Sequence, residues 1–371
     1  MKFTVERTTF FKALLHAQSI VEKKNTIPIL ANVKITADSD GIKLQSTNTD
    51  IEVVERIDGM VDTKGSVTAS ATKLYVIASK LHDGSQISFS YDEKSGQLKG
   101  KSGSTKFSLM TLPVEEFYAM PDSELPFTFS MAGAELRDIV NRTSFAVATE
   151  ETRHYLTGIY MHDNSKDRDK TLRVAATDGH RLACLEVTLP EGAEGIPGVI
   201  IPKKTMQEVV KLMDGTDQDV EISLSQNRIR FNLKDIVFTS KLIEGTYPDY
   251  EKVIPTNNDK RMEVSAADMK SAVDKASAFS EKARGIKVFI GKGKVNVSTN
   301  IPEEGGLDDE IDSDYNDEAI EFSFNHKYLL DILEQVKSGR AAFTFSDSPS
   351  PVVIYDGEDT TSVYVLMPMR I

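Results

Sequence analysis

Three stretches of the chain repeat one pattern of apolar and polar positions. Each begins with a short amphipathic helix, in which four inward-facing positions follow one another at steps of three, one and three residues. That spacing places the four on one helix face. The quartets are Phe11, Leu14, Leu15 and Gln18; Leu136, Ile139, Val140 and Thr143; and Met269, Ala272, Val273 and Ala276. A spacing that recurs three times predicts three related units.

A second helix is expected in each repeat, followed by a turn that closes on glycine. The turns span residues 80–84, 211–215 and 335–339, and glycine suits the left-handed residue that commonly ends a helix. Alternating runs follow, such as residues 86–90 and 220–224, and predict strands. The six helices are expected within residues 7–24, 72–82, 131–142, 203–211, 265–284 and 327–340.

The length of 371 residues predicts two or three domains, and the repeat favours three of roughly 120 residues each. Proline-containing stretches at residues 120–126 and 247–255 mark the joints. The expected domains are residues 1–125, 126–254 and 255–371.

The net charge of −13 alone argues against a nucleic-acid partner, but its distribution reverses that inference. The six helical windows hold 18 Lys+Arg and 9 Asp+Glu, so the rest of the chain sums to −22. Residues 301–320 contain nine acidic residues and no basic one. One interpretation is that the helices simply have solvated polar faces. The other is a basic, phosphate-attracting surface built from helices, with acid elsewhere.

The single cysteine, Cys184, excludes an internal disulfide framework and suits a reducing compartment. It lies in a strand-like run at residues 182–187, which predicts a buried, unreactive thiol. The N-terminus lacks the apolar core of a signal peptide, and no stretch is apolar enough to span a membrane. We therefore expect a soluble, cytoplasmic protein.

Signals for catalysis are weak. Residues 96–102 resemble a phosphate-binding loop, but they lie between two strand-like runs and have one residue too few, so a hairpin connection is expected. Residues 177–181 combine Asp178, His180 and Arg181, which could support acid–base work. No nucleophile motif accompanies them, and six histidines with one cysteine provide no zinc site of ordinary spacing. A turn with exposed polar groups is the expected structure, with no catalytic residue, cofactor or metal.

The C-terminal residues 362–371 form the last strand of the third repeat and contain two methionines beside a proline. Alternation predicts that Val363 and Val365 are core residues. Flexible thioethers suit a surface that accepts several apolar partners, so residues 367–371 are interpreted as a site. The alternative is a core strand that happens to be last.

Five segments resemble the bacterial sliding clamp, the beta subunit of the DNA polymerase III holoenzyme. They are residues 1–7, 27–32, 176–182, 247–250 and 364–370, and they cover the chain in order. The resemblance implies an α+β fold with three repeated clamp domains, each with two helices packed on two antiparallel sheets. The resemblance further implies that two chains form a ring, a head-to-tail homodimer. Double-stranded DNA would pass through this ring without sequence readout, and the ring would act as a non-catalytic processivity factor.

The resemblance also implies a pocket for short linear motifs, rich in Gln, Leu and Phe, of DNA polymerase subunits, the clamp loader and repair proteins. Carried over residue by residue, it comprises Leu156, Thr177, Gly179, His180, Arg181, Leu182, Pro248, Val253, Asn325, Tyr328, Val365, Leu366, Met367, Pro368, Met369 and Arg370. The chain departs from the family pattern at Lys252, Ala283, Pro349 and Pro351, which concerns the rim of the pocket.

The DNA contacts implied by the resemblance and the charge distribution are Lys24, Lys73, Arg137, Lys203 and Lys204. The implied dimer interface contains Phe107 and Leu109, which alternation places on one strand face, opposite Ser277 and Ala278. Two other functions remain open at this point: a three-domain peptide-binding scaffold that forms no ring, and an enzyme that uses Asp178 and His180.

Overall fold

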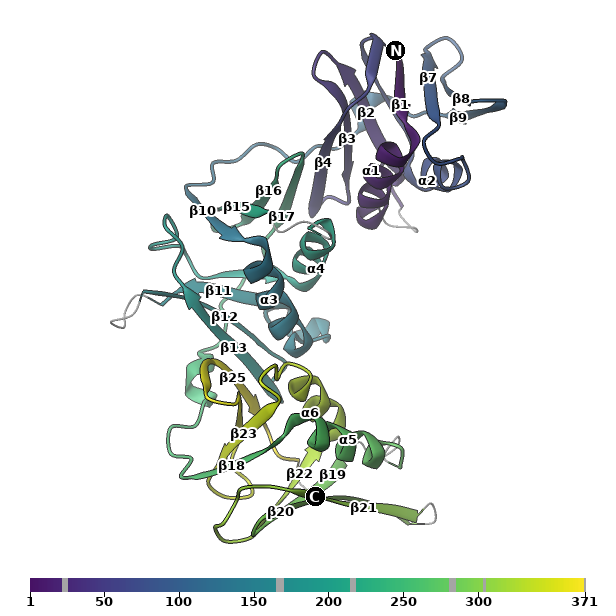
Figure 1. Cartoon of the computed structure of the whole chain (residues 1–371). Helices are drawn as coiled ribbons and strands as arrows, with labels where there is room; N and C mark the ends of the chain where they lie inside the picture. The colour runs from purple at the N-terminus through teal and green to yellow at the C-terminus, as the bar shows by residue number, and fades with distance from the viewer. Residues whose placement is uncertain (22–25, 165–169, 214–217, 280–284, 303–304, 370–371) are drawn as a thin grey trace. The chain divides into compact units, whose positions relative to one another are not determined.

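The computed structural model describes residues 1–21, 26–164, 170–213, 218–279, 285–302 and 305–369, which form two compact units (Figure 1). Unit 1 contains residues 1–134 and 204–242, and unit 2 contains residues 135–203 and 243–371. Helices α3 (Gly133–Thr143) and α4 (Lys203–Leu212) lie where the chain passes from one unit to the other.

Unit 1 contains two antiparallel sheets and the helices α1 (Arg7–Ile20) and α2 (Ala71–Ser79). The eight-stranded sheet has the order β10-β15-β16-β17-β4-β3-β2-β6, with β2 (Asn32–Asp38), β3 (Gly41–Thr47), β4 (Ile51–Ile57), β6 (Gly65–Ser70), β10 (Phe127–Ala132), β15 (Asp219–Leu224), β16 (Arg228–Leu233) and β17 (Ile236–Lys241). The five-stranded sheet has the order β5-β1-β7-β8-β9, with β1 (Lys2–Glu6), β5 (Met60–Thr63), β7 (Gln86–Asp92), β8 (Gln97–Ser102) and β9 (Thr105–Met110). Short 3-10 turns are η1 (Pro28–Ala31) and η2 (Val114–Glu116).

Helix α1 shows the predicted spacing, but its buried quartet lies one residue off: Phe10, Ala13, Leu14 and Ala17 are buried, whereas Phe11 and Gln18 are half-buried and Leu15 is 46% exposed. The first predicted quartet is therefore wrong, and the other two are buried at all four positions.

The Glu6 carboxylate caps helix α1 by accepting hydrogen bonds from the backbone of Thr8 and Thr9, both at 2.8 Å. Its apolar face packs on α2 and on strands of both sheets, and the Phe10 ring lies 5.1 Å from the ring of Phe89. Phe10 and Leu14 are fully buried, and each large apolar side chain buried in this way contributes roughly 1.5–3 kcal/mol.

Unit 2 also contains two antiparallel sheets, with the helices α5 (Ala266–Ser277) and α6 (His326–Leu333). The eight-stranded sheet has the order β14-β11-β12-β13-β25-β24-β23-β18, with β11 (Gly158–Asp163), β12 (Thr171–Thr177), β13 (Arg181–Thr188), β14 (Val199–Pro202), β18 (Lys260–Ser265), β23 (Arg340–Phe345), β24 (Val352–Asp356) and β25 (Asp359–Leu366). The four-stranded sheet has the order β21-β20-β19-β22, with β19 (Gly285–Gly291), β20 (Lys294–Ile301), β21 (Gly305–Asp312) and β22 (Ile320–Asn325). Short 3-10 segments are η3 (Ser144–Ala146), η4 (Glu151–Leu156) and η5 (Tyr250–Val253).

The pairing of β13 with β25 positions the candidate site. The strands are antiparallel, with Arg181 opposite Leu366 and Leu182 opposite Val365. The start of β13 and the end of β25 therefore lie side by side. This register brings the hairpin that precedes β13 next to the residues that follow β25, although the two are far apart in sequence.

The alternation expected for β25 is wrong in part. Val365 is buried as expected, but Val363 is only half-buried, and Tyr364 and Leu366 are fully buried too. The strand lies inside the sheet, between β13 and β24, and both of its faces are covered: Val365 packs in an apolar cluster with Leu182, whereas the Tyr364 hydroxyl accepts a hydrogen bond from Arg142 of α3. A strand buried on both faces loses the period of two.

Each of the six helical windows coincides with a helix, as predicted; five of the helices are shorter than their windows, whereas α4 is one residue longer. Gly84 and Gly339 do have positive φ angles, of 72° and 82°. They lie several residues beyond the ends of α2 and α6, so they close the following turns and do not cap the helices. Gly215 lies outside the described residues.

The structure corrects the expectation for residues 96–102 and confirms the one for Cys184. Residues 96–102 are not a hairpin connection as expected: Gly96 lies in the turn, and the other six residues form β8. The phosphate-loop interpretation remains excluded because no helix follows them. The buried thiol is confirmed, since Cys184 is 4% exposed and burial raises its pKa to about 12. Of the helices that the structure describes, none is long and apolar enough to cross a membrane.

Candidate functional site

The β12–β13 hairpin is a tight polar turn, as the sequence predicts. The Asp178 carboxylate accepts hydrogen bonds from the backbone of His180 and Arg181, at 2.9 and 3.1 Å. The Thr177 hydroxyl accepts from the backbone of Gly179 at 3.1 Å and donates to the carbonyl of Arg181 at 2.6 Å. Gly179 has φ +87°, which glycine adopts at little cost. The carboxylate that sequence reasoning considered for catalysis therefore has a structural task.

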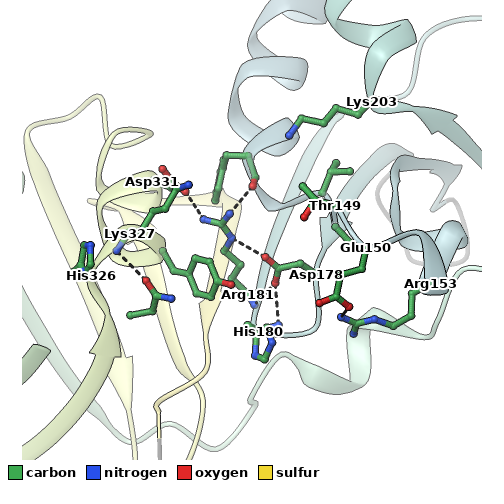
Figure 2. A pocket seen from close by; sticks show the side chains of 15 residues that line it. Thr149, Glu150, Arg153, Asp178, His180, Arg181, Lys203, His326, Lys327 and Asp331 are labelled. Carbon is green, nitrogen blue, oxygen red and sulfur yellow. Dashed lines mark hydrogen bonds and ion pairs between the residues drawn. The ribbon is translucent and has the colours of Figure 1, made fainter. Parts of the chain in front are cut away.

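Arg181 joins three parts of unit 2 through one buried guanidinium. It donates to Asp178 at 3.1 Å, to Asp331 of α6 at 2.5 Å, and to the carbonyl of Phe145 at 2.7 Å. Figure 2 shows the guanidinium between Asp178 and Asp331. It also lies 4.3 Å from the ring centre of Tyr328 and 5.2 Å from that of Phe145, within the range of cation–π attraction. Hydrogen bonds and stacking together fix Tyr328 against the hairpin.

A cavity of about 450 Å³ opens on the hairpin and the end of β25. It is lined by Gly179, His180, Asn325, Tyr328, Met367, Pro368 and Met369. The backbone of Met367 donates to the carbonyl of His180 at 3.0 Å, and that of Met369 donates to the carbonyl of Ser323 at 2.7 Å. Both methionines remain more than a third exposed. We call this cavity the methionine pocket: its backbone is held in place while its flexible thioethers face solvent.

The apolar residues assigned to the pocket by resemblance divide into two groups. Leu156, Leu182 and Val365 are buried in one cluster with Tyr247 and Tyr250, and Leu366 is fully buried too. Pro248 and Val253 are exposed on the neighbouring segment, which the Tyr247 hydroxyl joins to the hairpin by accepting from the backbone of Thr177 at 3.0 Å. Neither group is among the residues that line the methionine pocket.

A second cavity, of about 790 Å³, shares the wall formed by His180, Asn325 and Tyr328. We call it the lysine cavity, because Lys203 and Lys327 line it (Figure 2). Its other lining residues include Phe145, Arg153, Arg181 and Asp331. Burial and then the charge of Arg181 lower the pKa of Lys203. The Asp331 carboxylate opposes this shift, and the charge of Lys327 adds to it.

Sequence reasoning missed Phe145, Arg153, Lys327 and Asp331. A signal existed for Asp331, because Asn325, Tyr328 and Asp331 recur every three residues and so share one helix face. No local signal indicated that Phe145 or Arg153 would line this cavity, since both lie in short 3-10 segments without an amphipathic pattern of their own.

The remaining predicted residues lie apart from these cavities or outside the described residues. Lys24, Ala283 and Arg370 are outside them. Lys73 and Lys204 are exposed on α2 and α4, and Arg137 is half-buried on α3. Lys252 is exposed, and its ion pair with Asp249 at 2.7 Å raises its pKa. Pro349 and Pro351 lie in the loop before β24. Within the described ranges, no three His, Cys, Asp or Glu residues are grouped so that they could hold a metal ion.

Known structures match this fold over its whole length. A DnaN sliding clamp (DNA polymerase III subunit beta) from Bartonella birtlesii, bound to griselimycin, has a TM-score of 0.97 and 41% identity, with both chains covered completely. The DNA polymerase sliding clamp of Caulobacter crescentus has a TM-score of 0.95 and 38% identity, again with full coverage. The fold is that of a bacterial sliding clamp.

Family models and curated relatives agree with the structural matches. The N-terminal, central and C-terminal domain models of the DNA polymerase III beta subunit match residues 1–121, 130–249 and 251–370. The beta sliding clamps of Caulobacter vibrioides and Escherichia coli K12 are 39% and 32% identical, with both chains covered completely in each case. The chain belongs to the DNA polymerase III beta subunit family, whose members are non-catalytic processivity factors.

The Arg181 network generates a prediction about stability. Asp331→Asn removes one of the two carboxylates that neutralise a buried guanidinium, so we expect the free energy of unfolding to fall by roughly 1–3 kcal/mol. Glu334→Gln is the matched control, because Glu334 lies just after the same helix and forms an exposed ion pair with Lys270. The control should cost about 0.5 kcal/mol or less. Urea unfolding measures both, and equal losses would contradict the structural role of Asp331.

Proposed function

We propose that this chain forms a closed ring around duplex DNA, tethers the replicative polymerase, and receives partner proteins in the methionine pocket. The observation that carries the proposal is the pocket itself: two exposed methionines on a backbone held by hydrogen bonds to His180 and Ser323. Family membership supplies the context, since sliding clamps act through shape and surface. Because the proposed ring encloses bacterial DNA, we expect the protein to be located in the cytoplasm.

The partners are proposed to be short linear motifs rich in Gln, Leu and Phe, carried by DNA polymerase subunits, the clamp loader and repair proteins. Micromolar binding needs about 8 kcal/mol. Each buried Leu or Phe contributes roughly 1.5–3 kcal/mol, so two or three anchors suffice only when the pocket is formed in advance. Two features form the pocket in advance: the backbone hydrogen bonds donated by Met367 and Met369, and the restricted backbone of Pro368.

Deletion of residues 367–371 should therefore abolish the binding of a Gln-Leu-x-Leu-Phe peptide, measured by fluorescence anisotropy. The double variant Met367→Ala with Met369→Ala keeps the backbone and should weaken binding by about tenfold or more, because exposed thioether contacts are lost. Near-normal affinity in the truncated chain would rule out this pocket. Loss of dimerisation as well would mean that the segment is structural.

The ring is proposed to close between the first domain of one chain and the third domain of its partner. The domain boundaries after residues 125 and 254 are part of this proposal, and the ends of the three family matches support them. In the described residues, β9 pairs only with β8 and β21 only with β20, so each presents a free edge. Free edges are ready templates for pairing with another chain.

Charge complementarity supports pairing of these two edges. Lys101 and Lys106 are direct cross-strand neighbours, an unfavourable arrangement of like charges, and neither has an ion pair in the described chain. Strand β21 carries the acidic residues Asp308, Asp309, Glu310 and Asp312. It packs on α5, where Lys275 bonds Asp309 at 2.7 Å, and α5 ends at the proposed interface residues Ser277 and Ala278.

Phe107 and Leu109 require a different test from simple truncation. Leu109 is buried, and the ring of Phe107 lies over Gly100, where an added Cβ would be 2.1 Å from a ring atom. The two side chains pack with the core of their own unit, so alanine substitutions there would also reduce folding stability. Substitutions of exposed charged residues on the same edge test the interface without a loss of core packing.

Lys101→Glu with Lys106→Glu should weaken dimerisation by about tenfold or more at low salt, because repulsion from the acidic edge replaces attraction. Sedimentation velocity at micromolar concentration measures the shift toward monomer. Lys234→Glu, an exposed lysine in the β16–β17 turn, is the control and should leave the dimer unchanged. A monomer in the unchanged protein would instead favour the alternative of a peptide-binding scaffold that forms no ring.

DNA is proposed to contact Lys24, Lys73, Arg137, Lys203 and Lys204 through phosphates only. The helical windows carry the positive excess of the chain, and phosphate contacts without base contacts bind every sequence alike. A closed ring does not need strong contacts, because its topology prevents dissociation while sliding continues.

Lys73→Glu and Lys204→Glu should each weaken DNA binding equally on all sequences and reduce the salt dependence by about one unit per lost phosphate contact. Binding to several duplexes between about 50 and 200 mM salt measures both effects. Lys94→Glu, in the β7–β8 hairpin, is the control. A change of sequence preference would indicate base readout and contradict the model.

A further inference from the structure

The lysine cavity contains two cations that lack a counterion. Its two arginines are paired: Arg181 with Asp178 and Asp331, and Arg153 with Glu150 at 3.0 Å. Among the described residues, neither Lys203 nor Lys327 has a carboxylate within ion-pair distance. The cavity therefore has room, and positive charge, for one more anion.

The surroundings of the two lysines should strengthen the binding of such an anion. Lys203 is half-buried, and burial together with the charges of Arg181 and Lys327 lowers its pKa although the charge of Asp331 opposes them. A carboxylate between the two lysines would relieve that repulsion. Lys327 lies in the first turn of α6, an eight-residue helix whose N-terminal dipole also favours negative charge.

The cavity adjoins the methionine pocket, with which it shares three lining residues. His180, Asn325 and Tyr328 line both, and the rings of His180 and Tyr328 lie 6.1 Å apart and nearly parallel. A peptide anchored at Met367 and Met369 can therefore pass this shared wall, so that residues flanking its apolar motif enter the lysine cavity.

We infer that the partner peptides of this chain carry an Asp or Glu a few residues from the apolar motif, and that Lys203 and Lys327 bind its carboxylate. This inference rests on the proposed function of the methionine pocket. It adds a charge requirement to a site that would otherwise select by apolar fit alone.

A single carboxylate fits the cavity better than a nucleic-acid strand does. The lysine cavity is also lined by three carboxylates, those of Glu150, Asp178 and Asp331. A run of phosphates would pass these negative groups, whereas one acidic side chain can sit beside the two free lysines and avoid them. The charge pattern therefore favours a peptide.

The test compares labelled peptides that share the Gln-Leu-x-Leu-Phe motif and differ in one flanking residue, either before or after the motif, which is Glu, Gln or Lys. We expect Glu to bind the full-length protein roughly three- to fivefold more tightly than Gln in one of the two positions, at low salt. The ratio should approach one at 1 M salt, where the Debye length is about 3 Å. Lys in that position should bind more weakly than Gln.

Lys327→Gln should remove the advantage of Glu over Gln, and Lys327→Glu should reverse the preference in favour of Lys. Lys327 is the variant of choice because Lys203 is also a proposed DNA contact. Lys292→Gln is the matched control: Lys292 is exposed in the β19–β20 turn, whereas β22 brings Asn325 to the opposite end of β19, at Gly285. It should preserve the full ratio.

The outcomes separate the two proposals. Equal affinity for the Glu and Gln peptides, in both positions, would overturn the inference while the pocket still binds its motif. A Glu advantage that survives Lys327→Gln would overturn it too. Reduced binding of a single-stranded oligonucleotide to Lys327→Gln, with the peptide ratio intact, would assign the cavity to nucleic acid. If no motif peptide binds at all, the proposed function itself fails.

Discussion

The hydrogen-bonded pairing of β13 with β25 is the constraint on which the candidate site depends. Nothing in the local sequence of either strand encodes a pocket. The register of Arg181 against Leu366 places a polar turn beside a methionine-rich tail, and backbone bonds then hold the tail between the carbonyls of His180 and Ser323. A slip of one residue would exchange the faces of β25 and turn the buried Tyr364 away from Arg142.

Arg181 adds to this pairing an interaction that backbone pairing alone cannot provide. A guanidinium offers five donors in a fixed plane, and here it uses them on two carboxylates and a carbonyl from separate segments. Its faces also stack against Tyr328 and Phe145. A lysine at this position could not satisfy all of these partners, because its compact charge lacks the planar geometry. Arg181 thus stabilises the position of Tyr328, one of the residues that line both cavities.

The sequence predicts the fold better than it predicts the site. The repeated helical spacing correctly indicates the helices, since amphipathic periodicity is local and strong. The turn at residues 177–181 is equally local, because Asp and Gly encode it directly. The alternation of β25 misleads, since burial on both faces depends on elements distant in sequence. Phe145 and Lys327 become part of the site only through contacts that no local pattern carries.

Strand β25 follows every other strand of its eight-stranded sheet in the sequence, yet it lies in the interior of that sheet, between β13 and β24. Without β25, the strands from β14 to β13 and those from β24 to β18 would be two separate half-sheets, each with an unpaired edge. Such edges invite pairing with other chains, and contacts between distant segments form slowly. A chain truncated before β25 would therefore lose the pocket and expose the unpaired edges of β13 and β24, which can pair with other chains. The same strand, β25, thus completes the binding pocket and covers the two edges that would otherwise promote aggregation.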